Sequence, residues 1–172
     1  MKVSATAAVL LALALPAGAF DPIALPPELA RYRSWEATTD APYLVPEHVS
    51  TLCAPVVRER PVDAARGAGL HAGRFIRVYA NAAAQPALAT VPRPVAAGAV
   101  IAKEKLSKAD DTEPVAAAFM VRRDEARFRE TGGWEFLFYP PSRDTEATHQ
   151  ACAACHRGAQ GGDYVFGNER QD

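Results

Sequence analysis

The chain has 172 residues, of which 49% are hydrophobic and 23% are charged, and its formal net charge is −1. This composition is typical of one globular domain rather than two. Because the chain has no excess of basic residues, its charge favours neither nucleic acid nor an anionic membrane surface as a partner.

The first 19 residues differ from the rest of the chain. They carry one cation at Lys2, an apolar run over about residues 5–15, and a final Ala-Gly-Ala of the small-residue kind found at cleavage sites. This order is typical of a secretory signal peptide; the alternative, a retained anchor helix, fits less well because the apolar run is short for a bilayer. We therefore expect a signal peptide over residues 1–19, a single exported domain over residues 20–172, and no membrane anchor after cleavage.

Four stretches of the mature chain have the character of short antiparallel strands. Each is bounded by Gly, Pro, Asn or charged residues, which favour turns. Their ranges are 74–81, 98–106, 115–123 and 134–141. In the last stretch, Trp134, Phe136 and Phe138 alternate with their neighbours, so one face of that strand is predicted to be aromatic.

The predicted helices are short. Three candidates cover residues 26–35, 47–53 and 124–133, and a fourth begins at residue 144 or 145 and stops at Gly158. Prolines suit the first turn of the first helix, glycines can end the third, and an Asp or Thr can cap the start of the fourth. The predicted fold class is therefore α+β, with an antiparallel β-sheet, short helices and a C-terminal helix.

The predicted C-terminal helix carries the pattern C-x-x-C-H at Cys152, Cys155 and His156. Residues three apart lie on one side of a helix, so the two thiols can each add to a vinyl group of one haem. The next residue, His156, can turn beneath the porphyrin and ligate the iron, and this pattern is the signature of c-type haem attachment. Attachment takes place outside the cytoplasm, in agreement with export, and we expect one covalent haem c on this helix.

Three other uses of the cysteine pair fit the sequence less well. A zinc site needs four ligands, and only His149 lies near enough to be the fourth. A thioredoxin-like redox pair normally belongs to a βαβ pattern, which is absent, and a disulfide between Cys152 and Cys155 leaves His156 without a role. The third cysteine, Cys53, is expected to be a small buried apolar residue.

The second axial position of the iron has no obvious ligand. Only 16 residues follow His156, and none of them is Met, His or Cys. Met120 lies on a predicted strand, where a core role is commoner, and His48, His71 and His149 are the other candidates. We expect a five-coordinate iron, whose open distal side favours ligand binding or catalysis over electron transfer. A four-helix cytochrome c prime is disfavoured by the prolines and the strand patterns.

The sequence resembles the cytochrome P-460 family, which also contains the cytochromes c prime beta, over about residues 46–167. The segments that carry the resemblance are, in order, RFIRVYANAAA, GAVIAKEKL, AAAFMVRR, GGWEFLFYP and ACAACHRGAQGGDYVFG. It implies a small, β-sheet-rich and usually dimeric periplasmic haem protein. Cytochromes P-460 oxidise hydroxylamine and join a lysine to the porphyrin edge, whereas the c prime beta branch lacks this link and binds gases such as nitric oxide in an apolar distal pocket.

The family position of the crosslinking lysine falls on Lys103 in the segment IAKEK, with Lys105 as a near neighbour. Strand alternation places Ile101, Lys103 and Lys105 on one face of their strand, and this face could instead be solvated. The resemblance thus implies a haem–lysine link at Lys103, while the pattern alone leaves a surface lysine open.

Three further residues gain candidate roles from the resemblance. Phe119 matches an aromatic residue of the distal pocket, although core packing is an equal alternative. Glu130 lies near the position of a distal carboxylate that could take protons from substrate, and otherwise is a solvated glutamate at a helix end. Arg77 could pair with a haem propionate, or lie at the surface.

The first expected function is oxidation of a small nitrogen species, hydroxylamine or nitric oxide, with electrons passing to a partner cytochrome of the periplasm. A non-enzymatic nitric oxide binder is the second, and an electron-transfer cytochrome with a sixth protein ligand is the third. The resemblance also implies a homodimer.

Overall fold

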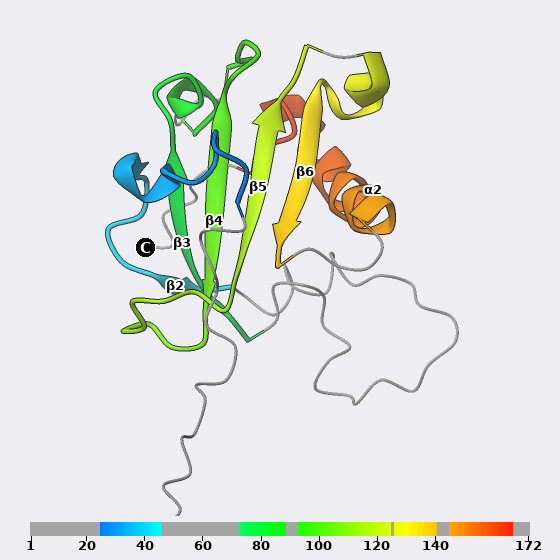
Figure 1. Ribbon diagram of the computed structural model, residues 1–172. Helices are drawn as coiled ribbons and strands as arrows, with labels where there is room; N and C mark the ends of the chain where they lie inside the picture. Colours follow the sequence, from blue (N-terminus) through cyan, green and yellow to red (C-terminus); the bar gives the residue numbers. More distant parts are fainter. Residues whose placement is uncertain (1–24, 46–72, 89–92, 125, 141–144, 167–172) are drawn as a thin grey trace, which may run out of the picture.

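The architecture is a twisted antiparallel sheet with the C-terminal helix packed across one face (Figure 1). The computed structural model describes residues 25–45, 73–88, 93–124, 126–140 and 145–166. The expected signal peptide, the expected helix over residues 47–53, and His48, Cys53 and His71 lie outside these ranges.

The four expected strands are confirmed, each within two residues of its predicted ends. They form the centre of the sheet in the order β3-β4-β5-β6, and every neighbouring pair is antiparallel. Their bounds are Phe75–Ala80 (β3), Val100–Leu106 (β4), Ala116–Arg122 (β5) and Trp134–Tyr139 (β6). Two short strands, β1 (Glu36–Ala37) and β2 (Tyr43–Leu44), both pair with β3 and complete the sheet.

The helices differ more from expectation. Three short 3-10 helices cover Tyr32–Ser34 (η2), Gln85–Leu88 (η4) and Ala126–Thr131 (η5). The described part of the chain has a single α-helix, α2, which covers Thr145–His156 and continues as the 3-10 helix η6, Arg157–Gly162. The helix expected over residues 26–35 is instead a turn followed by η2. Leu29 and Tyr32, both buried, are three residues apart, a spacing that suits a 3-10 helix as well as an α-helix.

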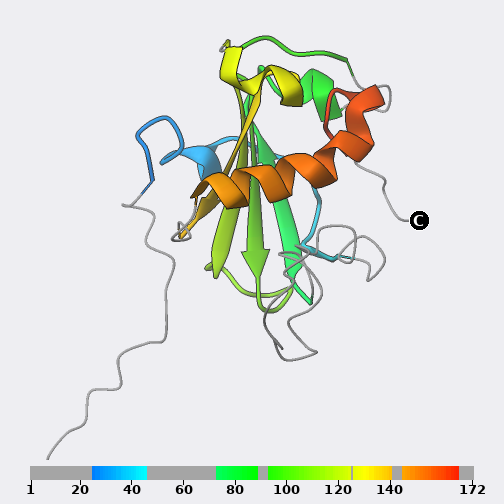
Figure 2. The ribbon, with the colours of Figure 1, turned by 90° about the vertical axis from the view of Figure 1, so that its right-hand side faces the viewer.

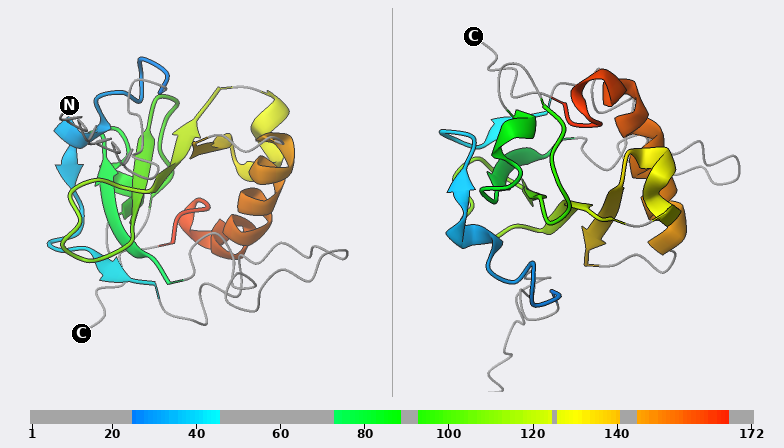
Figure 3. Two further views of the ribbon diagram at one scale, coloured as in Figure 1. Left: turned by 60° about the horizontal axis from the view of Figure 1, so that its bottom comes forward. Right: turned by 90° about the horizontal axis from the view of Figure 1, so that it is seen from above.

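The two faces of the sheet pack against different parts of the chain. The view from above places α2 on one side and the N-terminal segment, residues 25–45, on the other (Figure 3). A helix-side cluster lies beneath α2 and includes Val78, Ile101, Met120, Trp134, Phe136 and Ala153. A far-side cluster lies on the opposite face and includes Leu29, Tyr32, Tyr79, Ala102, Phe119 and Val121.

Side-chain alternation explains why the sheet has two buried faces. In β4 the consecutive residues Val100, Ile101 and Ala102 alternate between the far-side, helix-side and far-side clusters. Both faces must therefore be apolar over most of their area, and β4 is a buried strand in which all but one residue have little exposed surface. The class is α+β, as predicted.

Candidate functional site

A cavity lies between the helix-side face of the sheet and the C-terminal end of α2. The helix runs across this face (Figure 2). Cys152 and His156 line the cavity from α2, and three aromatic residues, Phe136, Phe138 and Phe166, line it from β6 and from the segment that follows η6. A mostly apolar cavity with a few polar groups is the usual form of a binding site for a small molecule or cofactor.

The sheet register gathers the floor of the cavity from four strands. Lys103 of β4 lies opposite Val78 of β3 and Ala118 of β5, and Ala118 in turn lies opposite Phe138 of β6. All four residues line the cavity. Because the residue between Lys103 and Phe138 is an alanine, the floor leaves room for a group above it.

His156 is held in one orientation by a backbone carbonyl. Its Nδ1 lies 2.7 Å from the carbonyl oxygen of Tyr164, which can only accept, so Nδ1 carries the proton and the lone pair of the ring is on Nε2. Burial, together with the positive charge of Lys103, lowers the pKa of His156 to about 4, against the opposing effect of the Tyr164 carbonyl. The imidazole is therefore neutral at physiological pH, the form that ligates a metal.

The two cysteines of the pattern differ in state. Cys152 is a free, partly buried thiol, and burial raises its pKa against the opposing charges of Lys105 and Lys103. Cys155 is disulfide-bonded, but not to Cys152, so the alternative of a disulfide within the pair is wrong. One sulfur cannot form a disulfide and a thioether together, and attachment of a haem at Cys155 therefore requires its reduced thiol.

Two lysines of β4 face the cavity rather than bulk solvent. Lys105 is 2% exposed, and its Nζ lies 4.6 Å from the centroid of the Phe138 ring. Burial, with repulsion from Lys103 and Arg74, lowers the pKa of Lys105 to about 7, against the attraction of Cys152. Burial also lowers the pKa of Lys103, which lines the same cavity. The alternative of a solvated lysine face is therefore wrong.

Of three further residues with predicted roles, Phe119 lines the cavity, and Arg77 and Glu130 do not. Phe119 borders it, but its ring packs in the far-side cluster at 5.3 Å from Tyr32 and 5.8 Å from Tyr139, centroid to centroid. Arg77 forms an ion pair with Glu104 on the far side of the sheet. Glu130 is exposed in η5 and does not line the cavity.

The other candidate iron ligands that the structure describes have packing roles. His149 accepts a hydrogen bond at Nδ1 from the backbone N–H of Phe136, 3.2 Å away, and its ring lies against Phe128 and Phe136. Met120 is 8% exposed in the helix-side cluster and borders the cavity. Within the described part of the chain, no three His, Cys, Asp or Glu residues gather in a metal-binding group.

The donor set fits a haem. A neutral imidazole with its Nδ1 proton bound to a carbonyl can offer Nε2 to iron, a thiol from the same helix faces the same cavity, and aromatic side chains supply an apolar wall. Fold and site together are those of a small β-sheet protein with a cavity suited to a haem-type cofactor beside its C-terminal helix. The family model described as Cytochrome P460 matches residues 31–167, and the chain belongs to this family. The resemblance predicted from the sequence is confirmed, and family membership makes the chain a haem-binding cytochrome. No individual curated protein gives a significant match.

Sequence reasoning missed the residues that hold His156 in place. Asp163 and Tyr164 follow η6 and both have positive φ, at 58° and 64°. The sequence analysis went no further than Gly158, where it ended the helix. No sequence pattern indicates that a histidine will contact the carbonyl of a residue eight positions further on, because this contact depends on how the chain turns back.

We expect a Gly132→Ala substitution to destabilise the protein and to disturb the Tyr164 contact with His156. Gly132 has a φ of +61°, and a Cβ there would lie 2.5 Å from Cε2 of Tyr164. Overpacking and the left-handed backbone should together lower the free energy of unfolding by roughly 1–3 kcal/mol. Thermal unfolding monitored by circular dichroism measures the loss.

Gly98→Ala is the matched control, because Gly98 has a φ of +90° but nothing within 4 Å of an added Cβ. It measures the backbone cost alone. If the two variants lose equal stability, the proposed clash with Tyr164 is wrong.

Proposed function

We propose that the chain is an exported mono-haem c-type cytochrome that oxidises a small nitrogen species, hydroxylamine or nitric oxide. Cys152 and Cys155 would hold the haem by thioether bonds, and Nε2 of His156 would ligate the iron. The observation that carries the proposal is the bond from His156 Nδ1 to the Tyr164 carbonyl, which directs a neutral imidazole beside the Cys152 thiol.

When bound, the haem would supply a redox-active iron that takes electrons from the substrate. The chain's own residues would shape the site around it. Phe136, Phe138 and Phe166 would exclude water from the cavity. Lys105, whose pKa is lowered to about 7, is able to take up a proton at Nζ near neutral pH. This is the role that sequence reasoning gave to Glu130, which lies away from the cavity.

Lys103 would be the lysine that the family joins to the porphyrin edge. Three observations support this assignment. The residue lines the cavity, it interacts electrostatically with both Cys152 and His156, and burial lowers the pKa of its amine. A lowered pKa increases the fraction of neutral amine, which is the nucleophilic form.

Nitric oxide binding without turnover is the second candidate function. The apolar character of the cavity wall favours this candidate. So does the position of Glu130, because its carboxylate is exposed and does not line the cavity. Both candidates need an iron with an open distal side, which we propose; among the candidate ligands that the structure describes, His149 and Met120 are engaged in packing.

Location and partners follow as further proposals. Export through the segment 1–19 would place the mature domain in a periplasm, where a partner cytochrome would accept the electrons and two copies would form a homodimer. Among the described residues, no helix combines the length and the apolar character that crossing a membrane requires.

We expect the protein, expressed with a cytochrome-maturation system, to reduce an added acceptor cytochrome when hydroxylamine is supplied. Lys103→Leu should lose this turnover but keep a nitric oxide-dependent shift of the haem absorption band. Lys108→Leu, a change at an exposed lysine of the loop after β4, is the matched control and should retain both activities.

The outcomes separate the candidates. If the unaltered protein binds nitric oxide but does not turn over hydroxylamine, the second candidate function, nitric oxide binding, replaces the first. A haem protein whose reduced spectrum shows six-coordinate, low-spin iron, and which binds neither ligand, would contradict both.

A further inference from the structure

The turn that follows η6 has an unusual backbone. Asp163 and Tyr164 adopt φ values of 58° and 64° in succession, although neither is a glycine. Left-handed conformations are unfavourable for residues with a side chain and persist only where the surroundings impose them. The contacts of these two residues show what imposes them.

Asp163 is tied to three separate parts of the sheet side of the molecule. Its Oδ1 lies 3.0 Å from Nη1 of Arg122 in β5, and its Oδ2 accepts a hydrogen bond from the backbone N–H of Val95 at 3.3 Å. Its carbonyl accepts the Nε1–H of Trp134 in β6 at 2.8 Å. The Asp163 side chain is 10% exposed and Trp134 is fully buried, so water competes little for these bonds.

Tyr164 is fixed from three directions as well. Its backbone N–H donates to the carbonyl of Ala159 at 2.9 Å, and its hydroxyl donates to the carbonyl of Glu130 at 3.3 Å. Its ring closely covers Gly132, where no Cβ would fit. With the amide, ring and hydroxyl all held, the remaining polar group, the carbonyl, is left in contact with His156 Nδ1 at 2.7 Å.

A hydrogen bond from Nδ1–H of a ligating histidine to a carbonyl raises the basicity of Nε2. More electron donation to a haem iron stabilises its oxidised form, so the strength of this bond is one of the means by which a protein sets the reduction potential. The strength depends in turn on how firmly the carbonyl is held.

We propose that Asp163 is a positioning residue that holds the Tyr164 carbonyl against His156 Nδ1 and thereby keeps the reduction potential of the haem iron low. The inference rests on the haem site of the proposed function and adds a residue that acts on it only through the turn. A low potential favours a ferric resting state, and it favours transfer of an electron from the reduced iron to an acceptor.

The test uses the haem-loaded protein with Asp163→Gly. Glycine adopts the left-handed conformation freely but removes the contacts with Arg122 and Val95. We expect unchanged haem content, a reduction potential shifted upward in a spectroelectrochemical titration, and an iron–histidine stretching band at lower frequency in resonance Raman spectra of the ferrous form. Asp163→Asn, which tolerates the same backbone and keeps an acceptor for Val95, should shift both readouts in the same direction by less.

Asp111→Gly is the matched control. Asp111 also accepts a backbone hydrogen bond in a turn, from the N–H of Lys108 at 2.9 Å, but that turn lies on the loop between β4 and β5. It should lose some stability without moving either readout.

Several outcomes would overturn the inference. If Asp163→Gly keeps the potential and the stretching band of the unaltered protein while losing stability, the role of Asp163 is structural only. If Asp163→Gly does not fold, an unshifted potential and stretching band in Asp163→Asn also show that the role is structural only. A failure of the proposed function would look different, because the unaltered protein itself would then carry no haem on His156.

Discussion

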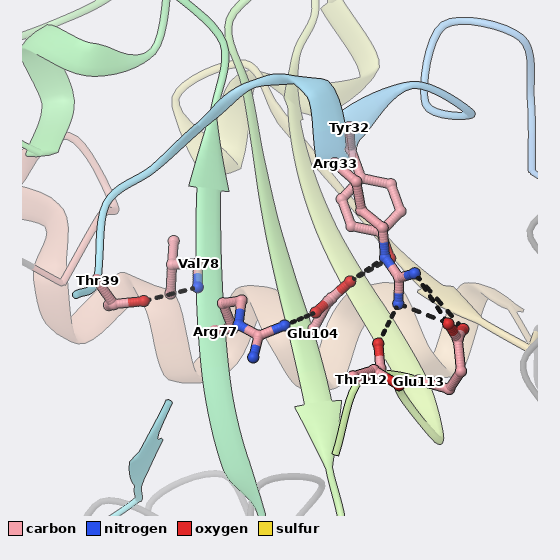
Figure 4. A network of polar contacts seen from close by, with 8 residues as sticks. All are labelled: Tyr32, Arg33, Thr39, Arg77, Val78, Glu104, Thr112 and Glu113. Carbon is pink, nitrogen blue, oxygen red and sulfur yellow. Dashed lines mark hydrogen bonds and ion pairs between the residues drawn. The ribbon is translucent and has the colours of Figure 1, made fainter. Parts of the chain in front are cut away.

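A double variant, Arg33→Met with Arg77→Met, is expected to lose about 3–5 kcal/mol of its free energy of unfolding, because it leaves a buried carboxylate with no cation beside it. The carboxylate is that of Glu104, which is fully buried at the centre of β4. Its Oε1 accepts bonds from Arg33 Nε at 2.6 Å and from the Tyr32 hydroxyl at 2.7 Å. Arg77 Nη1 lies 3.5 Å from its Oε2 (Figure 4).

The network has a structural consequence beyond its own energy. It joins the N-terminal segment to the strand whose flanking residues, Lys103 and Lys105, face the cavity on the other side of the sheet. Urea unfolding followed by circular dichroism measures the loss. Arg31→Met, at an exposed arginine of the same segment, should change stability little. An equally small change in the double variant would show that Glu104 needs neither arginine.

The second large effect is expected at the cysteines. A Cys152→Ala, Cys155→Ala double variant should release its haem into acidified organic solvent, whereas the unaltered protein should retain it through precipitation. Each single variant should keep one thioether bond and shift the absorption maximum of the reduced, pyridine-treated haem toward longer wavelength.

Cys53→Ala is the comparison variant, since it keeps both cysteines of the C-x-x-C-H pattern. It should retain covalent haem in full. Because Cys155 is disulfide-bonded in the structure, we also expect attachment to depend on a reductant during maturation. Covalent haem in the double variant would contradict the assignment of the attachment residues.

The central strands could be predicted because their pattern is local. Gly98 and the neighbouring prolines mark the start of β4, and the alternation of Trp134, Phe136 and Phe138 identifies both the strand and its buried face. The helix expected over residues 26–35 was wrong, because Leu29 and Tyr32 satisfy either helical repeat and the far face of the sheet decides between them.

The burial of the charged residues of β4 could not be predicted from the pattern alone. Lys103, Glu104 and Lys105 are charged, and three consecutive charges in a strand indicate solvent. In the structure Glu104 is buried and paired with Arg33, 71 residues away along the chain, and Lys105 is buried by the helix-side face. Charges that are matched by distant partners have no local signature, which is also why the ion pair between Arg77 and Glu104 was not predicted.

The proximal residues of the site could be predicted from the sequence, but the residues that hold them in position could not. Cys152, Cys155 and His156 form a contiguous motif whose spacing alone indicates the chemistry. The turn at Asp163 and Tyr164 acquires its role only when β5, β6 and η5 come together around it. Phe119 lines the same cavity as Ala118, but its ring packs in the far-side cluster against Tyr32.

The most direct test of the account is the mass of one peptide. Trypsin should release residues 144–157, which contain both cysteines and His156, from protein expressed with a cytochrome-maturation system. We predict that this peptide carries the additional mass of one haem, and that the peptide containing Lys103 is joined to it through the proposed lysine link. A colourless protein that yields the same peptide without that mass would contradict the assignment of the haem site.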